Sequence, residues 1–173
     1  MMTTATMTIS NNQITANANF ANGVALSHDG TTLHFTAKNN DLSGNDSSGI
    51  VLYSSVAIDT VVASIENNTI TNNQNLGSNA SAGIDLEQFT VLCVQFNDNV
   101  LTNNVGTDVF IGSTEASPAA CVAMTGNNSS SGYTLSNGTG VFNLSPTNAA
   151  SVNIGTITEI GVIASTPSCA CSS

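Results

Sequence analysis

Apolar and polar residues alternate along five short stretches of this chain, and each stretch ends at an asparagine-containing bend. The alternating apolar residues are Met7 and Ile9; Leu33, Phe35 and Ala37; Val61, Ala63 and Ile65; Leu92, Val94 and Phe96; and Ala120, Val122 and Met124. A period of two places these side chains on one face of an extended strand, so each stretch predicts a strand with one buried face. No stretch shows convincing helical periodicity.

Two asparagine motifs recur with these stretches at a nearly constant period. The first asparagine, which we call the anchor, recurs at sequence positions that differ by 28, 28, 31 and 28. Five residues later a second asparagine stands in four of the units, and Gly132 replaces it in the fifth. Two motifs in register indicate a true internal repeat. The anchors are Asn12, Asn40, Asn68, Asn99 and Asn127, and the second asparagines are Asn17, Asn45, Asn73 and Asn104.

A second apolar block follows each anchor and predicts a second strand in each repeat. The blocks are Gly23–Leu26, Gly49–Leu52, Gly83–Leu86, Asp108–Ile111 and Gly140–Leu144. A strand-rich unit of this length cannot bury its apolar face alone, but stacked copies can. We therefore predict an all-β fold, a parallel β-helix of about five to six coils, with equivalent strands paired in parallel about 4.8 Å apart.

Stacking of the repeats places the anchors above one another at a bend. A buried side-chain amide needs partners for its donors and its acceptor. A column of asparagines supplies both, each amide bonding the next. The asparagine content is therefore explained by a structural ladder through the five anchors.

The repeats form a single predicted domain over residues 1–164, followed by a Ser- and Cys-rich tail over 165–173. We expect residues 148–164 to be a degenerate last coil that has lost the anchor asparagine. The first coil begins almost directly with a strand and has no capping helix. We expect either that this segment was cut from a longer protein, which we favour, or that its exposed end stacks on a partner.

This pattern resembles the right-handed parallel β-helix, or pectin-lyase-like, repeat family over about residues 5–160. The run Asn67–Asn73 followed by Gly83–Leu86 carries the resemblance. It implies a right-handed β-helix, but the family includes lyases, glycosidases, epimerases, tailspikes and adhesive passengers. Phe96–Asn99 with the Gly-Ile/Val blocks is also similar to chlamydial polymorphic membrane proteins and autotransporter passenger domains. Their Gly-Gly-Ala-Ile form is not present here.

Charge excludes two classes of partner. Charged residues make up 7% of the chain, with one cation (Lys38) and a net charge of −10. With so few cations the chain cannot neutralise nucleic-acid phosphates or an anionic membrane surface. No apolar stretch approaches the length of a membrane-spanning helix and no signal peptide is recognisable, so we expect no membrane insertion by this segment. The scarcity of Lys and the abundance of Asn, Thr and Ser favour an extracellular or outer-surface location within a longer bacterial protein, with a cytosolic protein as the alternative.

Candidate catalytic groups are sparse. The acidic residues are scattered singly, and the best group is Asp85 and Glu87 on one strand, with Asp108 from the next coil. We expect these to lie mainly on a solvated face, with catalysis or Ca²⁺ binding as the alternative. The family resemblance implies a basic residue for lyase chemistry, and Lys38 is the one candidate, more simply read as a solvated strand end. We expect no cofactor.

The histidines and cysteines do not combine into a zinc motif, since His28 and His34 are six residues apart on a loop and a strand. We therefore expect no metal site. Cys93 and Cys121 stand one full repeat apart, each six residues before its anchor. They should lie on adjacent coils, facing outward, at a separation that a disulfide tolerates. We predict this bridge, with two free thiols as the alternative; Cys169 and Cys171 of the tail are too close to pair comfortably.

The leading functional hypothesis is a non-enzymatic, surface-exposed rod for adhesion or structural presentation, with a host surface protein or glycan as partner. The outward apolar residues Val51 and Phe110 are its expected interaction surface. The first alternative is a carbohydrate-active enzyme or glycan binder, which rests on fold analogy alone. The second is a subunit that self-stacks end to end into a fibre.

Overall fold

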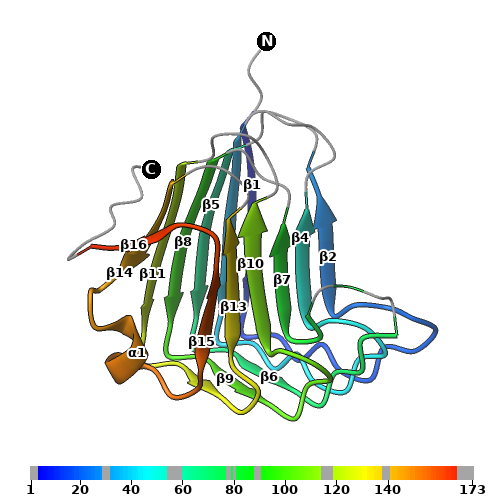
Figure 1. Ribbon diagram of the computed structural model, residues 1–173. Helices are drawn as coiled ribbons and strands as arrows, with labels where there is room; N and C mark the ends of the chain where they lie inside the picture. Colours follow the sequence, from blue (N-terminus) through cyan, green and yellow to red (C-terminus); the bar gives the residue numbers. More distant parts are fainter. Residues whose placement is uncertain are drawn as a thin grey trace.

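The chain forms a parallel β-solenoid of about 5 turns, as the repeat predicts (Figure 1). The computed structural model describes residues 4–28, 32–53, 60–76, 79, 81–87, 91–113, 119–137 and 141–166. The long, seven-stranded sheet has one strand from each coil, in chain order from the N-terminal end. Its strands are β1 (Thr4–Ser10), β3 (Thr32–Lys38), β5 (Thr60–Glu66), β8 (Val91–Asn97), β11 (Ala119–Thr125), β14 (Val141–Ser145) and β16 (Ile163–Ser165).

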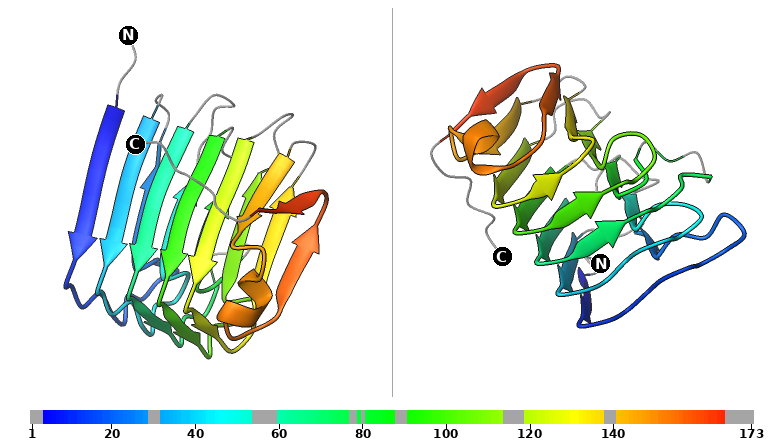
Figure 2. Two further views of the ribbon diagram at one scale, coloured as in Figure 1. Left: turned by 90° about the vertical axis from the view of Figure 1, so that its left-hand side faces the viewer. Right: turned by 90° about the horizontal axis from the view of Figure 1, so that it is seen from below.

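A second sheet of six shorter strands faces the long sheet, and a third sheet of three strands closes the bend between them. The second sheet contains β2 (Val24–Ser27), β4 (Ile50–Tyr53), β7 (Ile84–Glu87), β10 (Val109–Ser113), β13 (Tyr133–Asn137) and β15 (Ile157–Ile160). The third contains β6 (Thr69–Thr71), β9 (Val100–Thr102) and β12 (Asn128–Ser129). One short helix, α1 (Ala149–Val152), lies at the C-terminal end (Figure 2).

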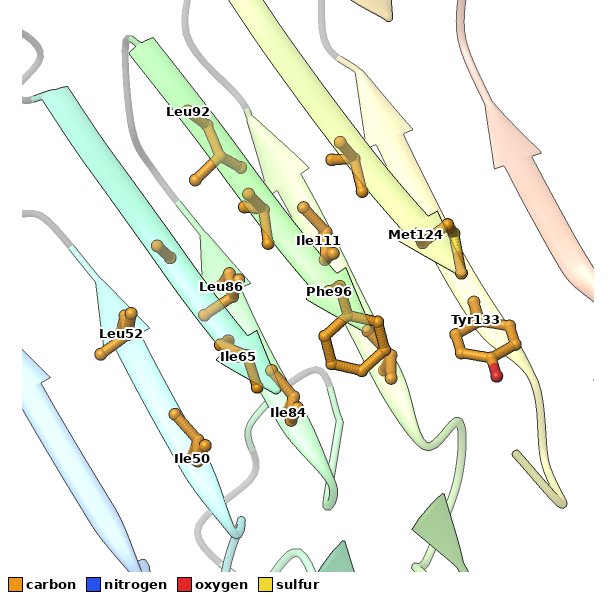
Figure 3. Packing of buried hydrophobic residues seen from close by; sticks show 14 of the residues in the cluster. Ile50, Leu52, Ile65, Ile84, Leu86, Leu92, Phe96, Ile111, Met124 and Tyr133 are labelled. Atoms are coloured by element: carbon orange, nitrogen blue, oxygen red, sulfur yellow. The ribbon is translucent and has the colours of Figure 1, made fainter. Parts of the chain in front are cut away.

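The core lies between the two larger sheets, and the alternation that predicted it is confirmed. In-register pairing stacks each inward residue on its counterpart one coil away, as in the column Phe35, Ala63 and Val94. All three side chains are buried. Figure 3 shows how side chains from both sheets fill the space between them. The Phe96 ring meets the edge of the Tyr133 ring, with centroids 6.4 Å apart, which adds a favourable aromatic contact to the burial.

The predicted asparagine ladder is present. Each anchor donates its side-chain Nδ2–H to Oδ1 of the next anchor, over 3.2, 2.9, 3.0, 2.9 and 2.8 Å. Its backbone N–H donates to the same oxygen at 3.0 Å in all five steps. The amide also reaches back to a carbonyl of the preceding coil, as Asn68 does to Ala37. The second asparagines form a parallel ladder from Asn17 to Asn104.

Two details of the last coils differ from the sequence prediction. Asn153, 26 residues after Asn127, occupies the anchor position and accepts from both the backbone and the side chain of Asn127. The last coil therefore keeps its ladder asparagine. In addition, the fifth strand of the second sheet is β13 (Tyr133–Asn137), whereas Val141 to Leu144 of the predicted block belong to β14 of the long sheet. The last coil is shorter than the others, with 26 residues between Asn127 and Asn153. Its motifs therefore do not fall at the positions that a fixed period of 28 predicts.

The tail lies almost wholly outside the described residues, and so do Cys169 and Cys171. Ser165, assigned to the tail from the sequence, is the last residue of β16. Thr166 donates its backbone N–H to the carbonyl of Leu144. The paired chain thus continues at least two residues past position 164.

Replacing Asn68 by Leu is expected to lower the free energy of unfolding by about 2–4 kcal/mol, because two buried donors of Asn40 lose their acceptor. The matched control is Asn12→Leu at the exposed end of the same ladder. It removes donors but leaves no buried group without a partner, so its effect should stay below about 1 kcal/mol. Urea unfolding followed by circular dichroism measures both. Equal effects would contradict the structural role of the ladder interior.

Candidate interaction surface

Asp108 has a structural role. Its carboxylate is fully buried and accepts from Asn104 Nδ2 at 2.8 Å, from Ser129 Oγ at 2.6 Å and from the backbone N–H of Ser131 at 2.8 Å. These bonds satisfy a buried charge and close the second ladder where the next asparagine is replaced by glycine. Burial, together with this neighbouring carboxylate, raises the pKa of the Tyr133 hydroxyl. Asp108 therefore does not lie on the solvated face that was expected.

Asp85 and Val51 take the outward register predicted for them, in a column that also contains Ala25, Phe110 and Thr134. Both side chains are nevertheless buried, Asp85 completely. The expectation of a solvated carboxylate at Asp85 and of an exposed apolar contact at Val51 is therefore wrong. Alternation identifies the side of a strand on which a residue lies, but it does not tell what covers that side.

The remaining candidates of the second sheet do not gather into one site. Glu87 is half-buried at the end of β7, next to Tyr53 in register. Phe110 is also half-buried, and its ring lies over the backbone of Gly112. Asp108 turns its carboxylate toward the bend instead. Among the described residues, no group of three or more His, Cys, Asp or Glu side chains is placed to hold a metal ion.

Cys93 and Cys121 are register partners on β8 and β11. Both are disulfide-bonded, and the register makes each the partner of the other. The bridge lies in the predicted outward column, in line with His34 and Val62. It joins two adjacent coils and closes a loop that is one repeat long.

Removing this bridge by the double change Cys93→Ala and Cys121→Ala is expected to lower the free energy of unfolding by about 3–4 kcal/mol, the chain-entropy value for a loop of about 28 residues. The experiment uses a Cys169→Ser, Cys171→Ser background. Alkylation in denaturant without reductant, followed by mass spectrometry of peptides, tests the bond directly. Labelling of Cys93 and Cys121 under those conditions would contradict it.

The outward face of the long sheet is regular and almost free of charge. Its side chains stand in columns, one residue from each coil. The column Thr8, Thr36, Ser64, Gln95 and Ala123 is flanked by the cysteine column on one side. On the other side stand Ser10, Lys38, Glu66, Asn97 and Thr125.

A groove of about 210 Å³ opens on this face across β3, β5 and β8. Its polar lining comes from the side chains of His34, Thr36, Ser64 and Gln95, and Val62 contributes an apolar patch. The lining therefore offers hydroxyl, imidazole and amide groups that donate and accept hydrogen bonds.

One ion pair borders the groove. Lys38 Nζ lies 3.3 Å from Glu66 Oε2 on the neighbouring strand. Ser64 Oγ donates to Glu66 Oε1 at 2.8 Å, and this bond is the main influence lowering the pKa of Glu66 below its ordinary value of 4.5. Partial burial raises the pKa and the Lys38 ammonium lowers it again. Lys38 is thus a salt-bridged strand-end residue.

The site residues predicted from the sequence did not include Thr36, Val62, Ser64 or Gln95. These four residues occupy the outward positions of the same alternating stretches whose inward positions identified the core. The groove itself depends on side-chain sizes in three successive coils, which no single repeat contains.

Comparison with protein-family models, curated protein sequences and solved structures finds no match for this chain. Within the described ranges, no helix is long and apolar enough to span a bilayer.

Acid should weaken the contribution of Glu66. Because its native pKa is lowered, the carboxylate stabilises the fold above about pH 4.5, and this contribution is lost as the pH falls through the native pKa. We expect Glu66→Gln to reduce the stability difference between pH 7 and pH 3 by about 0.5 kcal/mol, as for other partly exposed pairs. Urea unfolding at both pH values measures it. An unchanged difference would show that Glu66 does not contribute.

Proposed function

We propose that this chain is a non-enzymatic β-solenoid module of an exported, surface-exposed protein, and that it acts in adhesion or presentation through the outward face of its long sheet. The observation that carries the proposal is the groove on this face, whose lining combines hydroxyl and amide groups with apolar surface and contains no Asp, Glu, Lys or Arg. The partner that fits is an uncharged, hydroxyl-rich chain such as a neutral glycan. A solenoid suits this role because its extended, repetitive face can contact an extended partner.

The distribution of charge supports this face as the contact surface. The chain carries a net charge of −10. Apart from the Lys38–Glu66 pair, the outward positions of β1, β3, β5 and β8 contain no Asp, Glu, Lys or Arg. A partner docking there would therefore displace water from hydroxyls and amides without burying an unpaired charge.

The Cys93–Cys121 bridge supports an exported location. Disulfides form and persist in oxidising compartments and are rare in reducing ones. The bridge also ties two coils together on the outward face, where it joins the groove strand β8 to β11. Both effects suit a module that works outside the cell.

A carbohydrate-active enzyme is the second candidate, favoured by the glycan-compatible groove lining. The carboxylates predicted from the sequence give an enzyme little support. Asp108 is hydrogen-bonded at the end of the second ladder, and Asp85 is buried. The groove borders Glu66, but this carboxylate is held by Ser64 and Lys38. Binding without turnover is therefore the primary proposal.

Thr36→Arg is expected to weaken binding to a neutral polysaccharide at least tenfold, because a bulky cation then fills the groove. Thr134→Arg is the matched control: it is the same change at a half-buried outward threonine of the other large sheet. Binding would be measured on an array of neutral, acidic and basic polysaccharides with the purified chain. Equal loss in both variants would place the contact elsewhere, and release of new reducing ends would favour the enzyme.

A further inference from the structure

Both asparagine ladders have a direction. In every step the asparagine of one coil donates to Oδ1 of the asparagine in the next coil toward the C-terminus. Each oxygen thus accepts from two donors, a backbone N–H and a side-chain amide, of the coil before it. A ladder therefore ends in unused donors at its C-terminal end and in unused acceptors at its N-terminal end.

The chain closes the donor ends itself. Asn153, last in the first ladder, donates its Nδ2–H to the carbonyl of Ala149 in α1 at 2.8 Å. Asn104, last in the second ladder, donates its Nδ2–H to Asp108 Oδ1 at 2.8 Å. An acceptor from the chain thus replaces the next asparagine in each case. Figure 2 shows α1, β15 and β16 gathered at this end of the stack.

The acceptor ends stay open. Oδ1 of Asn12 and Oδ1 of Asn17 accept no hydrogen bond from any described residue, although both asparagines donate to the second coil. The strands of this coil, β1 and β2, are the outermost strands of their sheets. In Figure 2 no described element lies beyond β1.

The surface around these acceptors includes uncovered parts of the apolar core columns. The inward side chains of the first coil are only partly buried: Met7, Ile9 and Ile14. Their counterparts one coil later are at most 1% exposed: Phe35, Ala37 and Leu42. Residues 4–28 contain no Asp, Glu, Lys or Arg. Charges and prolines normally protect open sheet edges from pairing, and the described strands of the first coil have neither.

We propose that the N-terminal end of the solenoid is a docking surface for an asparagine-bearing coil of another parallel β-solenoid. Such a coil presents strand edges to β1 and β2 and covers Met7, Ile9 and Ile14. Its two bend asparagines, five residues apart, direct their backbone N–H and Nδ2–H groups at Oδ1 of Asn12 and Asn17. The interface repeats the contact already made between coils within the chain.

A second copy of this chain fits less well. Packing of two N-terminal ends would bring acceptors against acceptors. Head-to-tail packing would bring the open acceptors to ladder ends whose side-chain donors are already bonded to Ala149 and Asp108. The proposal is also independent of the proposed function, which concerns the outward face of the long sheet.

The test inserts a copy of residues 32–59 between Thr3 and Thr4 of the full chain, which adds one coil in phase. We expect Tm to rise by more than about 4 °C, the shift that corresponds to 1–2 kcal/mol in a chain of this size. Replacing the two asparagines of the inserted copy that correspond to Asn40 and Asn45 by Ala should remove most of the rise. An unchanged Tm after insertion, or a rise that does not depend on these asparagines, would overturn the proposal.

Two charge variants on β1 locate the contact. Ala5 is exposed but lies in the inward column above Leu33, so Ala5→Glu should abolish the rise in Tm of the extended chain. Thr6→Glu places the same charge on the outward side of the same strand and should leave the rise unchanged. Neither should alter the Tm of the unextended chain by more than about 2 °C. Equal behaviour of the two variants would contradict docking at this end.

Sedimentation of the unextended chain tests the choice of partner. We expect a monomer whose mass does not change with concentration. Self-association that Ala5→Glu abolishes and Thr6→Glu preserves would assign the surface to a second copy and overturn the partner proposed here.

Discussion

The amide-to-amide hydrogen bond at the bends is the interaction on which the rest of this structure depends. At each bend the backbone N–H groups beside the anchor bond carbonyls of the neighbouring coil, as those of Asn39 and Asp41 do. The buried N–H of the anchor itself has no such carbonyl, and a buried N–H without a partner is costly. One Oδ1 per coil accepts both the N–H and the Nδ2–H of the preceding anchor. The same contact therefore satisfies the bend and fixes the height and register of the next coil.

Fixing the register at the bends lets the rest of each coil vary in length. Successive anchors are 28 residues apart in three of the steps, 31 in one and 26 in the last. The extra or missing residues lie between the strands, so the inward columns keep their alignment and the core stays continuous. The core also holds aromatic residues from both large sheets, such as Phe96 and Tyr133, whose rings meet edge to face.

The sequence was sufficient for the features that repeat. A period of two within each strand, together with a nearly constant longer period between strands, predicts four features. These are the inward columns, the parallel pairing, the ladder and the side-by-side position of Cys93 and Cys121. Asn153 and the strand β13 were missed because a fixed period was extended into coils that are shorter. The burial of Asp85 and the groove beside Ser64 depend on contacts among different coils, which alternation does not describe.

The low charge of this chain follows from the same stacking. In a parallel, in-register solenoid each side chain lies about 4.8 Å from its counterpart in the next coil. Two like charges at that distance repel by roughly 3.5 kcal/mol at an effective dielectric constant of 20. The acidic residues are accordingly paired with other residue types: Asp85 with Val51 and Phe110, Glu87 with Tyr53, and Glu66 with Lys38. A fold that excludes repeated charges from its columns is left with broad faces of hydroxyls and amides.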